Sequence, residues 1–209
     1  MSAAGQRVVD PGLDALLAGH PVPRRALFLD RDGVINEDDG YVHSASGTRW
    51  IPGIFALCRA AVDAGYLIVV VTNQAGIARG LYTDAQFRDY TRWMHEAFAG
   101  RGVPIAATYY CPHHPTAGLH EARIVCECRK PAPGMFLAAC TALGIDAAAS
   151  MHVGDKASDL EAARAAGVAT RLLLGDAPLP AGERRIHALT EAMPFLAYEP
   201  PMATGVQDG

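Results

Sequence analysis

Short, continuous apolar runs alternate with helical segments along this chain of 209 residues, and this alternation constrains the fold more than any other feature. The runs at 26–29 and 66–71 are too short for typical helices, and the second is rich in β-branched residues. Continuous apolar strands are typical of parallel sheets that helices cover on both faces. The alternation therefore predicts a three-layer α/β/α sandwich with a mainly parallel, Rossmann-like sheet and right-handed crossovers.

Helix-start and helix-stop signals separate the helices from the strands. Thr83 and Gln86 have the spacing of a capping box, and Gly144 is of the residue type that ends helices in a left-handed cap. The segments expected as helices are 53–64, 84–99, 133–143 and one from 158 to just before Gly167. The segments expected as strands, besides the two runs above, are 108–110, 150–153, 171–174 and one near 186, which a last helix to about 196 follows.

This succession fills one domain. Between Asp32 and Thr72 there is room for one loop and one helix only, so we expect no cap domain over the sheet. We expect residues 25–197 to form the domain and residues 1–24 to be an extension that packs on it or frays. Residues 198–209, which lack helical or strand periodicity, are expected to be a disordered tail.

Composition limits the classes of partner. A net charge of -4 gives no reason to expect a nucleic acid or an anionic membrane, so any positive contacts to an anionic ligand must be local. No apolar run reaches the length of a membrane span, and no secretory signal is visible near the N-terminus. We therefore expect a cytoplasmic protein with no membrane partner. An uncapped single domain also makes a monomer the default expectation.

Polar side chains gather where the predicted strands end. Asp30 and Asp32 follow the first apolar run, and Gly33 allows a sharp turn behind them. The other clusters of this kind are Thr72 with Asn73, Arg129 with Lys130, and Asp155 with Lys156 and Asp159. Ligands of open α/β sheets bind outside the carboxyl ends of the strands, and this places the clusters where chemistry is done.

The four clusters lie in stretches that resemble the four motifs of the haloacid dehalogenase-like phosphatases. These stretches are DRDGVIN, VVVTNQAGIARG, CRKPAPGM and HVGDKASDLEAA. The resemblance covers roughly residues 26–175. A cysteine-containing loop and the sequence Gly40-Tyr41-Val42-His43 are similar to the D-glycero-D-manno-heptose 1,7-bisphosphate phosphatases within this superfamily.

The resemblance implies a Mg²⁺-dependent phosphatase that hydrolyses the C7 phosphate of the heptose bisphosphate through an aspartyl-phosphate, for surface-glycan biosynthesis. It implies Asp30 as nucleophile, Asp32 as general acid and base, and Asp30, the Asp32 carbonyl and Asp155 as Mg²⁺ ligands. The residue types agree with this chemistry. A carboxylate nucleophile divides a very slow hydrolysis into two easier steps. Because both the carboxylate and the phosphate dianion are negative, the nucleophile can approach the phosphate only when nearby cations offset this charge. Lys130 and the Thr72 hydroxyl are expected to contact the phosphoryl oxygens.

Each of these assignments has a structural alternative. Asp30, Asp32 and Asp155 could be helix caps and turn formers, and Asp159 could simply favour the start of its helix. Lys156 could contact a phosphate or hold the acidic residues in place.

Four residues have the composition of a metal site. The pairs Cys111-x-His113 and Cys126-x-Cys128 offer three thiolates and an imidazole, which is the pattern of structural zinc. The resemblance carries Zn²⁺ to these four residues. His114 is the nearest competitor for the imidazole position. The alternative is a set of reduced cysteines in a mobile loop, while Cys58 and Cys140 lie on apolar helix stripes and are expected in the core.

Specificity is expected from residues near this loop. Arg129 follows Cys128 directly, and a guanidinium can bind a remote phosphate through two hydrogen bonds. The residues expected to bind substrate are Asp38, Tyr41, Thr72, Asn73, Gln74, Ala75, Arg129, Lys130 and Lys156. Two positions depart from the common family pattern. Val34 stands where Thr is frequent, and Ala75 stands where Ser is common, which puts any side-chain contact from that position in doubt.

Two rival functions remain at this point. Histidinol-phosphate phosphatases have a similar cysteine loop, but their substrate carries an ammonium group, which favours an acidic contact where Arg129 stands. The loop could also mark a zinc-containing binding module on an inactive phosphatase-like scaffold. The complete set of Asp30, Asp32, Thr72, Lys130 and Asp155 argues against that alternative.

Overall fold

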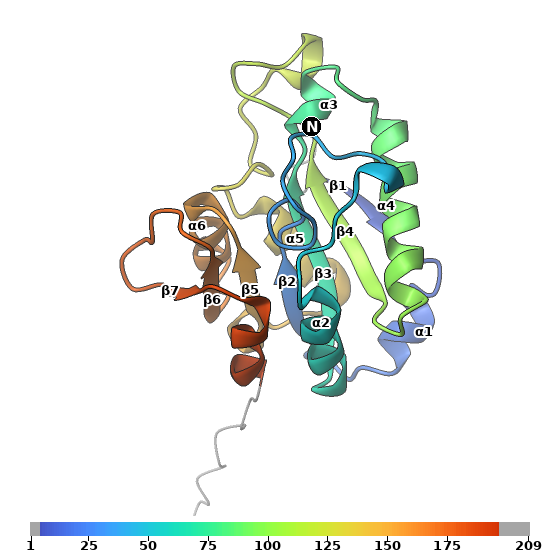
Figure 1. The fold of residues 1–209 in the computed structure, drawn as a ribbon, viewed down its shortest axis with the longest axis vertical. Helices are drawn as coiled ribbons and strands as arrows, with labels where there is room; N and C mark the ends of the chain where they lie inside the picture. Colours follow the sequence, from blue (N-terminus) through green and yellow to red (C-terminus); the bar gives the residue numbers. More distant parts are fainter. Residues whose placement is uncertain (1–4, 197–209) are drawn as a thin grey trace, which may run out of the picture.

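A mainly parallel sheet forms the centre of the protein in a computed structural model that describes residues 5–196 (Figure 1). Its strands are β1 (Gln6–Val9), β2 (Arg25–Leu29), β3 (Tyr66–Asn73), β4 (Ile105–Cys111), β5 (Met151–Gly154), β6 (Thr170–Leu174) and β7 (Arg184–Ile186). Their order across the sheet is β1-β4-β3-β2-β5-β6-β7. All neighbouring strands pair in parallel except β1, which pairs antiparallel with β4.

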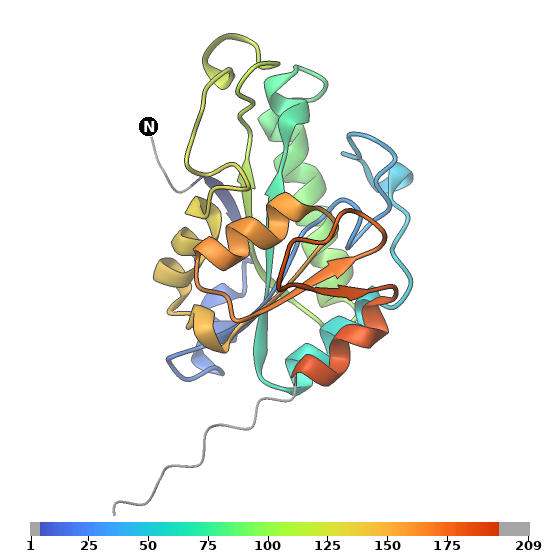
Figure 2. The same cartoon turned by 90° about the vertical axis from the view of Figure 1, so that its left-hand side faces the viewer.

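Helices cover both faces of this sheet (Figure 2). The α-helices are α1 (Leu13–Ala18), α2 (Ile54–Asp63), α3 (Ala75–Ala78), α4 (Asp84–Ala99), α5 (Gly134–Leu143) and α6 (Ala157–Ala165). The 3-10 helices are η1 (Ala45–Gly47), η2 (His120–Ala122), η3 (Ala147–Ala149) and η4 (Leu189–Leu196). Side chains of α2, α4 and η4 share one apolar core, and side chains of α1, α5 and α6 share the other. The structure therefore confirms the expected three-layer α/β/α sandwich.

Strand β3 shows why the sheet is apolar on both faces. Ile68 and Val70 belong to the core on the α2 and α4 side, whereas Val69 and Val71 belong to the core on the α5 and α6 side. Alternate residues of a strand point to opposite faces, so a strand buried on both sides reads as an unbroken apolar run.

Local signals set most helix ends as predicted. The Thr83 side chain accepts a hydrogen bond from the Gln86 N–H, and the Gln86 side chain accepts one from the Thr83 N–H, which is a complete capping box. Gly144 ends α5 in the left-handed conformation. The expected start of α6 at Ser158 is wrong by one residue. The helix begins at Ala157, and the Asp159 carboxylate accepts from the Lys156 N–H at 2.9 Å.

The segment before β2 contributes to the fold. β1 adds an edge strand to β4, and α1 packs against the same apolar core as α5. Its strand and helix have weak sequence signals, because β1 has four residues and α1 has six. The predicted tail at 198–209 lies outside the described residues. Among the described residues, no helix is both long enough and apolar enough to cross a membrane.

The strand order creates a crevice at the carboxyl ends. β2 lies between β3 on one side and β5 on the other: the chain continues from β2 to β3 and β4 on one side, and after β4 it crosses back to β5 and β6 on the other side. A reversal of this kind is where ligands bind in open α/β sheets. Asp30 follows β2, Asn73 ends β3 and Asp155 follows β5, so their side chains meet at this crevice.

Candidate active site

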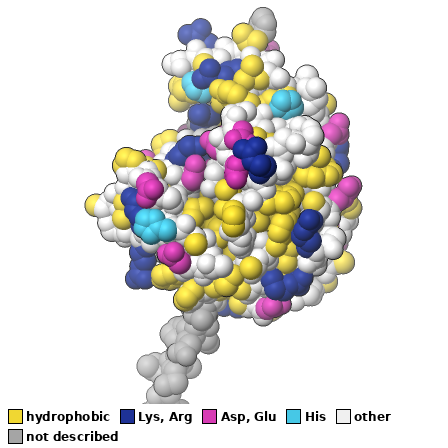
Figure 3. Space-filling model, viewed as in Figure 1, with side chains coloured by type: hydrophobic (Ala, Val, Ile, Leu, Met, Phe, Trp, Pro, Cys, Tyr) yellow, Lys and Arg dark blue, Asp and Glu magenta, His cyan; other side chains and the backbone are white. Residues whose placement is uncertain are grey.

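A cavity of about 340 Å³ opens at the carboxyl ends of β2, β3 and β5. Its volume lies within the range of small-molecule sites. Figure 3 shows acidic and basic side chains close together on this face of the molecule. The residues that line the cavity are Asp30, Asp32, Asp38, Gly40, Tyr41, Thr72, Asn73, Gln74, Ala75, Tyr82, Lys130, Lys156, Ser158 and Asp159. Of the residues expected to bind substrate, all except Arg129 are among them.

Lys130 lies between two carboxylates beneath the cavity. Its Nζ is 2.8 Å from Asp30 Oδ1 and 2.7 Å from Asp159 Oδ1, and it donates to the Val71 carbonyl at 2.8 Å. Burial alone would lower the pKa of this ammonium, but the charges of Asp159 and Asp30 raise it. Lys130 is therefore a cation held against the predicted nucleophile.

Asn73 fixes the backbone that carries Lys130. The Asn73 Nδ2 donates to the Lys130 carbonyl, and the Lys130 N–H donates to Asn73 Oδ1, both at 3.1 Å. This pair of hydrogen bonds joins the end of β3 to the segment before α5. The Asn73 side chain thus positions the lysine.

Three carboxylates form a group that could hold a cation. One oxygen from each of Asp30, Asp155 and Asp159 lies within 4.8 Å of the others. Asp155 Oδ1 is buried and finds no hydrogen-bond partner among the described residues. Burial, and next the charge of Asp30, raise the pKa of Asp155 to about 7. Clustered carboxylate oxygens with an unsatisfied member fit a hard cation such as Mg²⁺.

Gly33 allows Asp155 to approach the end of β2. Gly33 has a φ of +86°, and a Cβ at this position would lie 2.4 Å from Asp155 Oδ2. A side chain here would therefore displace a carboxylate of the group. This supports the interpretation that the glycine after the Asp-x-Asp sequence is required for the site.

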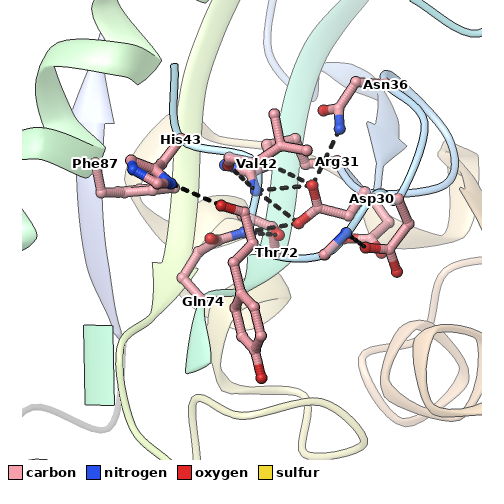
Figure 4. A network of polar contacts seen from close by, with 12 residues as sticks. Asp30, Arg31, Asn36, Val42, His43, Thr72, Gln74 and Phe87 are labelled. Atoms are coloured by element: carbon pink, nitrogen blue, oxygen red, sulfur yellow. Dashed lines mark hydrogen bonds and ion pairs between the residues drawn. The ribbon is translucent and has the colours of Figure 1, made fainter. Parts of the chain in front are cut away.

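Asp32 lies at the cavity wall and accepts several hydrogen bonds. Figure 4 shows its donors Arg31, Asn36 and Gln74 within this polar network. Arg31 donates to Asp32 Oδ1 at 3.0 and 2.7 Å and to Oδ2 at 2.7 Å. Asn36 Nδ2 donates to Oδ1 at 3.1 Å, and Gln74 Nε2 donates to Oδ2 at 3.2 Å. The carboxylate is therefore held in one orientation.

Arg31 is itself fully buried. Its guanidinium lies over the rings of Phe87 and Tyr90, at 5.6 and 5.3 Å from the ring centroids, and donates to the Val42 carbonyl at 2.8 Å. Burial would lower the pKa of Arg31, but Asp32 raises it above its ordinary value, so this group stays charged. Arg31 thereby connects Asp32 to the loop that precedes His43.

Lys156 lies at the mouth of the cavity. Its Nζ is 3.2 Å from Asp38 Oδ2 and 3.4 Å from Asp155 Oδ2, and about half of its side chain is exposed. Partial burial opposes its charge, but Asp155 and then Asp30 raise its pKa. In this arrangement Lys156 holds acidic residues and remains accessible to an anion. Nearby, Tyr41 has a φ of +57° and an exposed side chain.

Cys111, at the end of β4, forms a second polar cluster with His113 and with Cys126 and Cys128 from the loop before α5. The sulfur atoms of Cys111, Cys126 and Cys128 are 3.2 to 3.5 Å apart, and His113 Nδ1 is 3.4 Å from Cys128 Sγ. A tetrahedral site with Zn–S bonds of about 2.3 Å has S···S edges of about 3.8 Å, so a small expansion admits a metal ion. His114 does not belong to this cluster, because its Nδ1 accepts from the Thr116 and Ala117 N–H groups. Hydrogen bonding with Cys111, which outweighs the opposing effect of burial, lowers the pKa of Cys128 to about 5.

Arg129 lies outside the lining of the main cavity. Its Nη1 donates to the His113 carbonyl at 3.1 Å, and its side chain lines a neighbouring hollow of about 300 Å³. Lys130 borders both hollows. The guanidinium is thus fixed to the cysteine loop next to the cavity, with further N–H groups besides the one bound to His113.

Two features of this site had no clear sequence signal. One is the ion pair of Asp159 with Lys130, which the helix-start alternative for Asp159 did not include. The other is the hydroxyl of Tyr82, which donates to Gln74 Oε1 at 2.6 Å and brings a residue from the loop before α4 into the site. Cys58 and Cys140 pack in or against the apolar cores, as expected.

Comparison with known proteins agrees with this geometry. Residues 127–189 match the family model described as HAD-hydrolase-like. The chain is 52% identical over 149 residues to D-glycero-beta-D-manno-heptose-1,7-bisphosphate 7-phosphatase of Escherichia coli O6:H1, which covers 71% of this chain and 78% of the relative. It is 51% identical over 152 residues to D-glycero-alpha-D-manno-heptose-1,7-bisphosphate 7-phosphatase of Burkholderia mallei, with 73% and 80% covered. The solved structure of D,D-heptose 1,7-bisphosphate phosphatase from B. bronchiseptica with magnesium and phosphate has a TM-score of 0.71 and 34% identity, covering 82% of this chain and 97% of that one.

Proposed function

Because this chain belongs to the heptose 1,7-bisphosphate 7-phosphatase family of haloacid dehalogenase-like hydrolases, we propose that it hydrolyses the C7 phosphate of D-glycero-D-manno-heptose 1,7-bisphosphate. The observation that carries the proposal is the position of Asp30 at the floor of the cavity, paired with Lys130 and close to Asp155. This geometry suits a carboxylate that attacks a phosphate whose charge is offset.

The reaction has two steps. An Asp30 oxygen forms a bond to phosphorus while the bond to the sugar oxygen breaks, and that oxygen takes a proton from Asp32. Water then attacks the aspartyl-phosphate and gives a proton to Asp32. The bond between phosphorus and Asp30 breaks, which releases phosphate and restores both carboxyl groups. Lys130 and the Thr72 hydroxyl stabilise the phosphoryl oxygens in both steps.

Asp30, Asp155 and the Asp32 carbonyl would hold Mg²⁺. When bound, this cation offsets charge between the nucleophile and the phosphate. The buried and unpaired Asp155 Oδ1 supports this assignment. Asp159, which is bound to Lys130 and to the Lys156 N–H, acts on the site by fixing the lysine.

Cys111, His113, Cys126 and Cys128 would hold a structural Zn²⁺. A closed set of four ligands leaves no open position for chemistry, and the loop that they close contains little buried apolar surface. The ion would keep Arg129 beside the cavity, where its unused N–H groups bind the second phosphate of the substrate. Asp38, Tyr41, Lys156 and the backbone near Ala75 would bind the rest of the sugar phosphate.

Histidinol-phosphate phosphatase is the rival enzyme. Its substrate has one phosphate and one ammonium group, so Arg129 is an unfavourable neighbour for it. The intact pairing of Asp30 with Lys130 at the cavity argues against an inactive binding module on a phosphatase-like scaffold. We further propose a cytoplasmic monomer with no nucleic-acid or membrane partner; the net charge of -4 provides no general attraction to a nucleic acid or an anionic membrane.

Steady-state kinetics with three substrates tests the function. Release of inorganic phosphate is measured from the α and β anomers of the heptose 1,7-bisphosphate and from histidinol phosphate. We expect kcat/KM for one anomer of the bisphosphate to exceed that for histidinol phosphate by at least about 100-fold, because only a bisphosphate engages Arg129. Equal values would contradict the proposed substrate. Asp30→Asn should reduce turnover by at least about 10⁴-fold while the substrate still binds.

A further inference from the structure

Gln74 uses every polar group of its side chain inside the protein. It is 2% exposed, although it lines the cavity. Its Nε2 donates to Thr72 Oγ1 at 2.8 Å and to Asp32 Oδ2 at 3.2 Å, and its Oε1 accepts from the Tyr82 hydroxyl at 2.6 Å. Its backbone N–H donates to the Cys111 carbonyl at 2.8 Å. No N–H of Gln74 is left for a substrate.

The chemistry of its partners fixes the orientation of the amide. An ionised Asp32 only accepts hydrogen bonds, so the amide nitrogen must face it. Tyr82 donates to the amide oxygen from the opposite side. Gly76 makes room for the tyrosine, because a Cβ there would lie 2.2 Å from the Tyr82 ring. His43 stacks on this ring, with centroids 4.7 Å apart.

The same amide determines how the Thr72 hydroxyl can act. A hydroxyl has one hydrogen and two acceptor lone pairs. Since Thr72 Oγ1 accepts from Gln74, its own hydrogen remains free to point into the cavity. There it can donate to a phosphoryl oxygen.

The amide also distinguishes the two oxygens of Asp32. Oδ1 accepts three hydrogen bonds, two from Arg31 and one from Asn36. Oδ2 accepts one from Arg31 and the longer one from Gln74. Oδ2 is therefore the oxygen with a lone pair available to carry a proton, and the hydrogen bond from Gln74 fixes the direction in which that lone pair points.

We propose that Gln74 is a positioning residue for catalysis rather than a substrate ligand: its amide aims Asp32 Oδ2 at the leaving oxygen and turns the Thr72 hydroxyl toward the phosphoryl group. This inference rests on the proposed function, since it uses Asp32 as the proton donor. In the first step the proton passes from Asp32 Oδ2 to the sugar oxygen as the bond between phosphorus and that oxygen breaks. The electrons of that bond stay on the sugar oxygen.

The dependence on the leaving group separates this role from a purely structural one. A sugar alkoxide is strongly basic and needs the proton, whereas the phenolate released from p-nitrophenyl phosphate leaves without one. The ratio kcat/KM reports the first step only, because that step commits the substrate. Loss of Asp32 positioning therefore affects the alkyl ester more than the aryl ester.

The test uses Gln74→Met, which keeps the length of the side chain, and Gln74→Glu, which keeps its shape but places a second carboxylate next to Asp32. We expect kcat/KM for the heptose bisphosphate to fall about 100-fold or more in both variants, and for p-nitrophenyl phosphate to fall at least about tenfold less. Tyr110→Phe is the control, because its buried hydroxyl bonds to Gln6 and Asp84, away from the cavity.

Each outcome decides the proposal. An equal fall in kcat/KM for both esters, or no fall, overturns it. If the wild type does not hydrolyse the heptose bisphosphate, the proposed function fails, and glycerol phosphate serves as the alkyl ester for the same comparison. Thermal melting of each variant shows whether it is folded, and at least the isosteric Gln74→Glu is expected to fold.

Discussion

Removal of Asp159 should destabilise the protein by several kcal/mol, because it leaves a buried ammonium with one carboxylate fewer. Asp159 is 1% exposed and Lys130 is 3% exposed, and their charged atoms are 2.7 Å apart. Breaking a buried ion pair by removing one partner costs about 3–5 kcal/mol. In Asp159→Ala the Lys156 N–H at the start of α6 also loses its acceptor, which adds about 1 kcal/mol.

One effect acts in the opposite direction. The carboxylate of Asp159 is one cause of the raised pKa of Asp155, so its removal relieves repulsion within the acidic group. The charge of Asp159 contributes less to that pKa than burial and Asp30 do, so this relief is smaller than the loss of the ion pair with Lys130. The net loss expected for Asp159→Ala is therefore about 4 kcal/mol. Asp159→Asn keeps a polar acceptor at both contacts, and its loss should be about half as large.

Urea denaturation followed by circular dichroism measures this difference. With a slope of about 2 kcal/mol per molar urea, the midpoint for Asp159→Ala should fall by about 2 M without a change in slope. Glu161→Ala is the matched control, because Glu161 is an exposed carboxylate on the same helix, and its effect should stay within about 0.5 kcal/mol. A midpoint for Asp159→Ala within 0.5 M of the control, roughly 1 kcal/mol at that slope, would refute the reasoning.

Three further predictions concern pH and metal. Burial and the charge of Asp30 raise the pKa of Asp155 to about 7, so this carboxylate becomes protonated below pH 7 and competes less well for Mg²⁺. Mg²⁺ affinity measured by calorimetry should weaken by up to about tenfold per pH unit below pH 7. A constant affinity from pH 8 to 5 would contradict this. Burial lowers the pKa of His95 to about 4, so between pH 6.5 and 4 the unfolded state binds the proton before the folded state does. The free energy of unfolding should therefore fall by up to about 3 kcal/mol as the pH is lowered through this range. His95→Gln should flatten this part of the plot of unfolding free energy against pH, and an unchanged slope would count against the assignment. Cys128→Ser should lower the bound zinc measured by atomic absorption and expose residues 112–127 to protease, whereas an unchanged cleavage pattern would speak against a metal-held loop.

The sequence predicted those parts of the fold and the site that are determined by residues close together along the chain. The apolar runs gave the strands, and the polar residues that follow them, such as Asp30 and Asp155, lie together because parallel strands end at one edge of the sheet. The Thr83 capping box could be identified for the same reason, since both of its hydrogen bonds span three residues.

Contacts between distant residues could not be predicted in this way. Gln74 and Asp32 are 42 residues apart, and their hydrogen bond depends on how side chains pack at the end of the sheet. The position of Arg129 outside the cavity lining depends on the shape of the cysteine loop, which the order of residues does not reveal. The four-residue strand β1 has too short a pattern to be recognised, and only its pairing with β4 defines it.

Strand β1 has a consequence for self-association. It covers the edge of β4, whose seven residues are all buried and which would otherwise present open backbone groups to another chain. The opposite edge of the sheet is β7, which has only three residues, two of them arginines. Short and charged edge strands discourage pairing between molecules. Truncation before Asp10 would therefore convert a protected sheet into one with an apolar, exposed border, and the shortened chain should form aggregates with added β-structure at concentrations where the full chain does not.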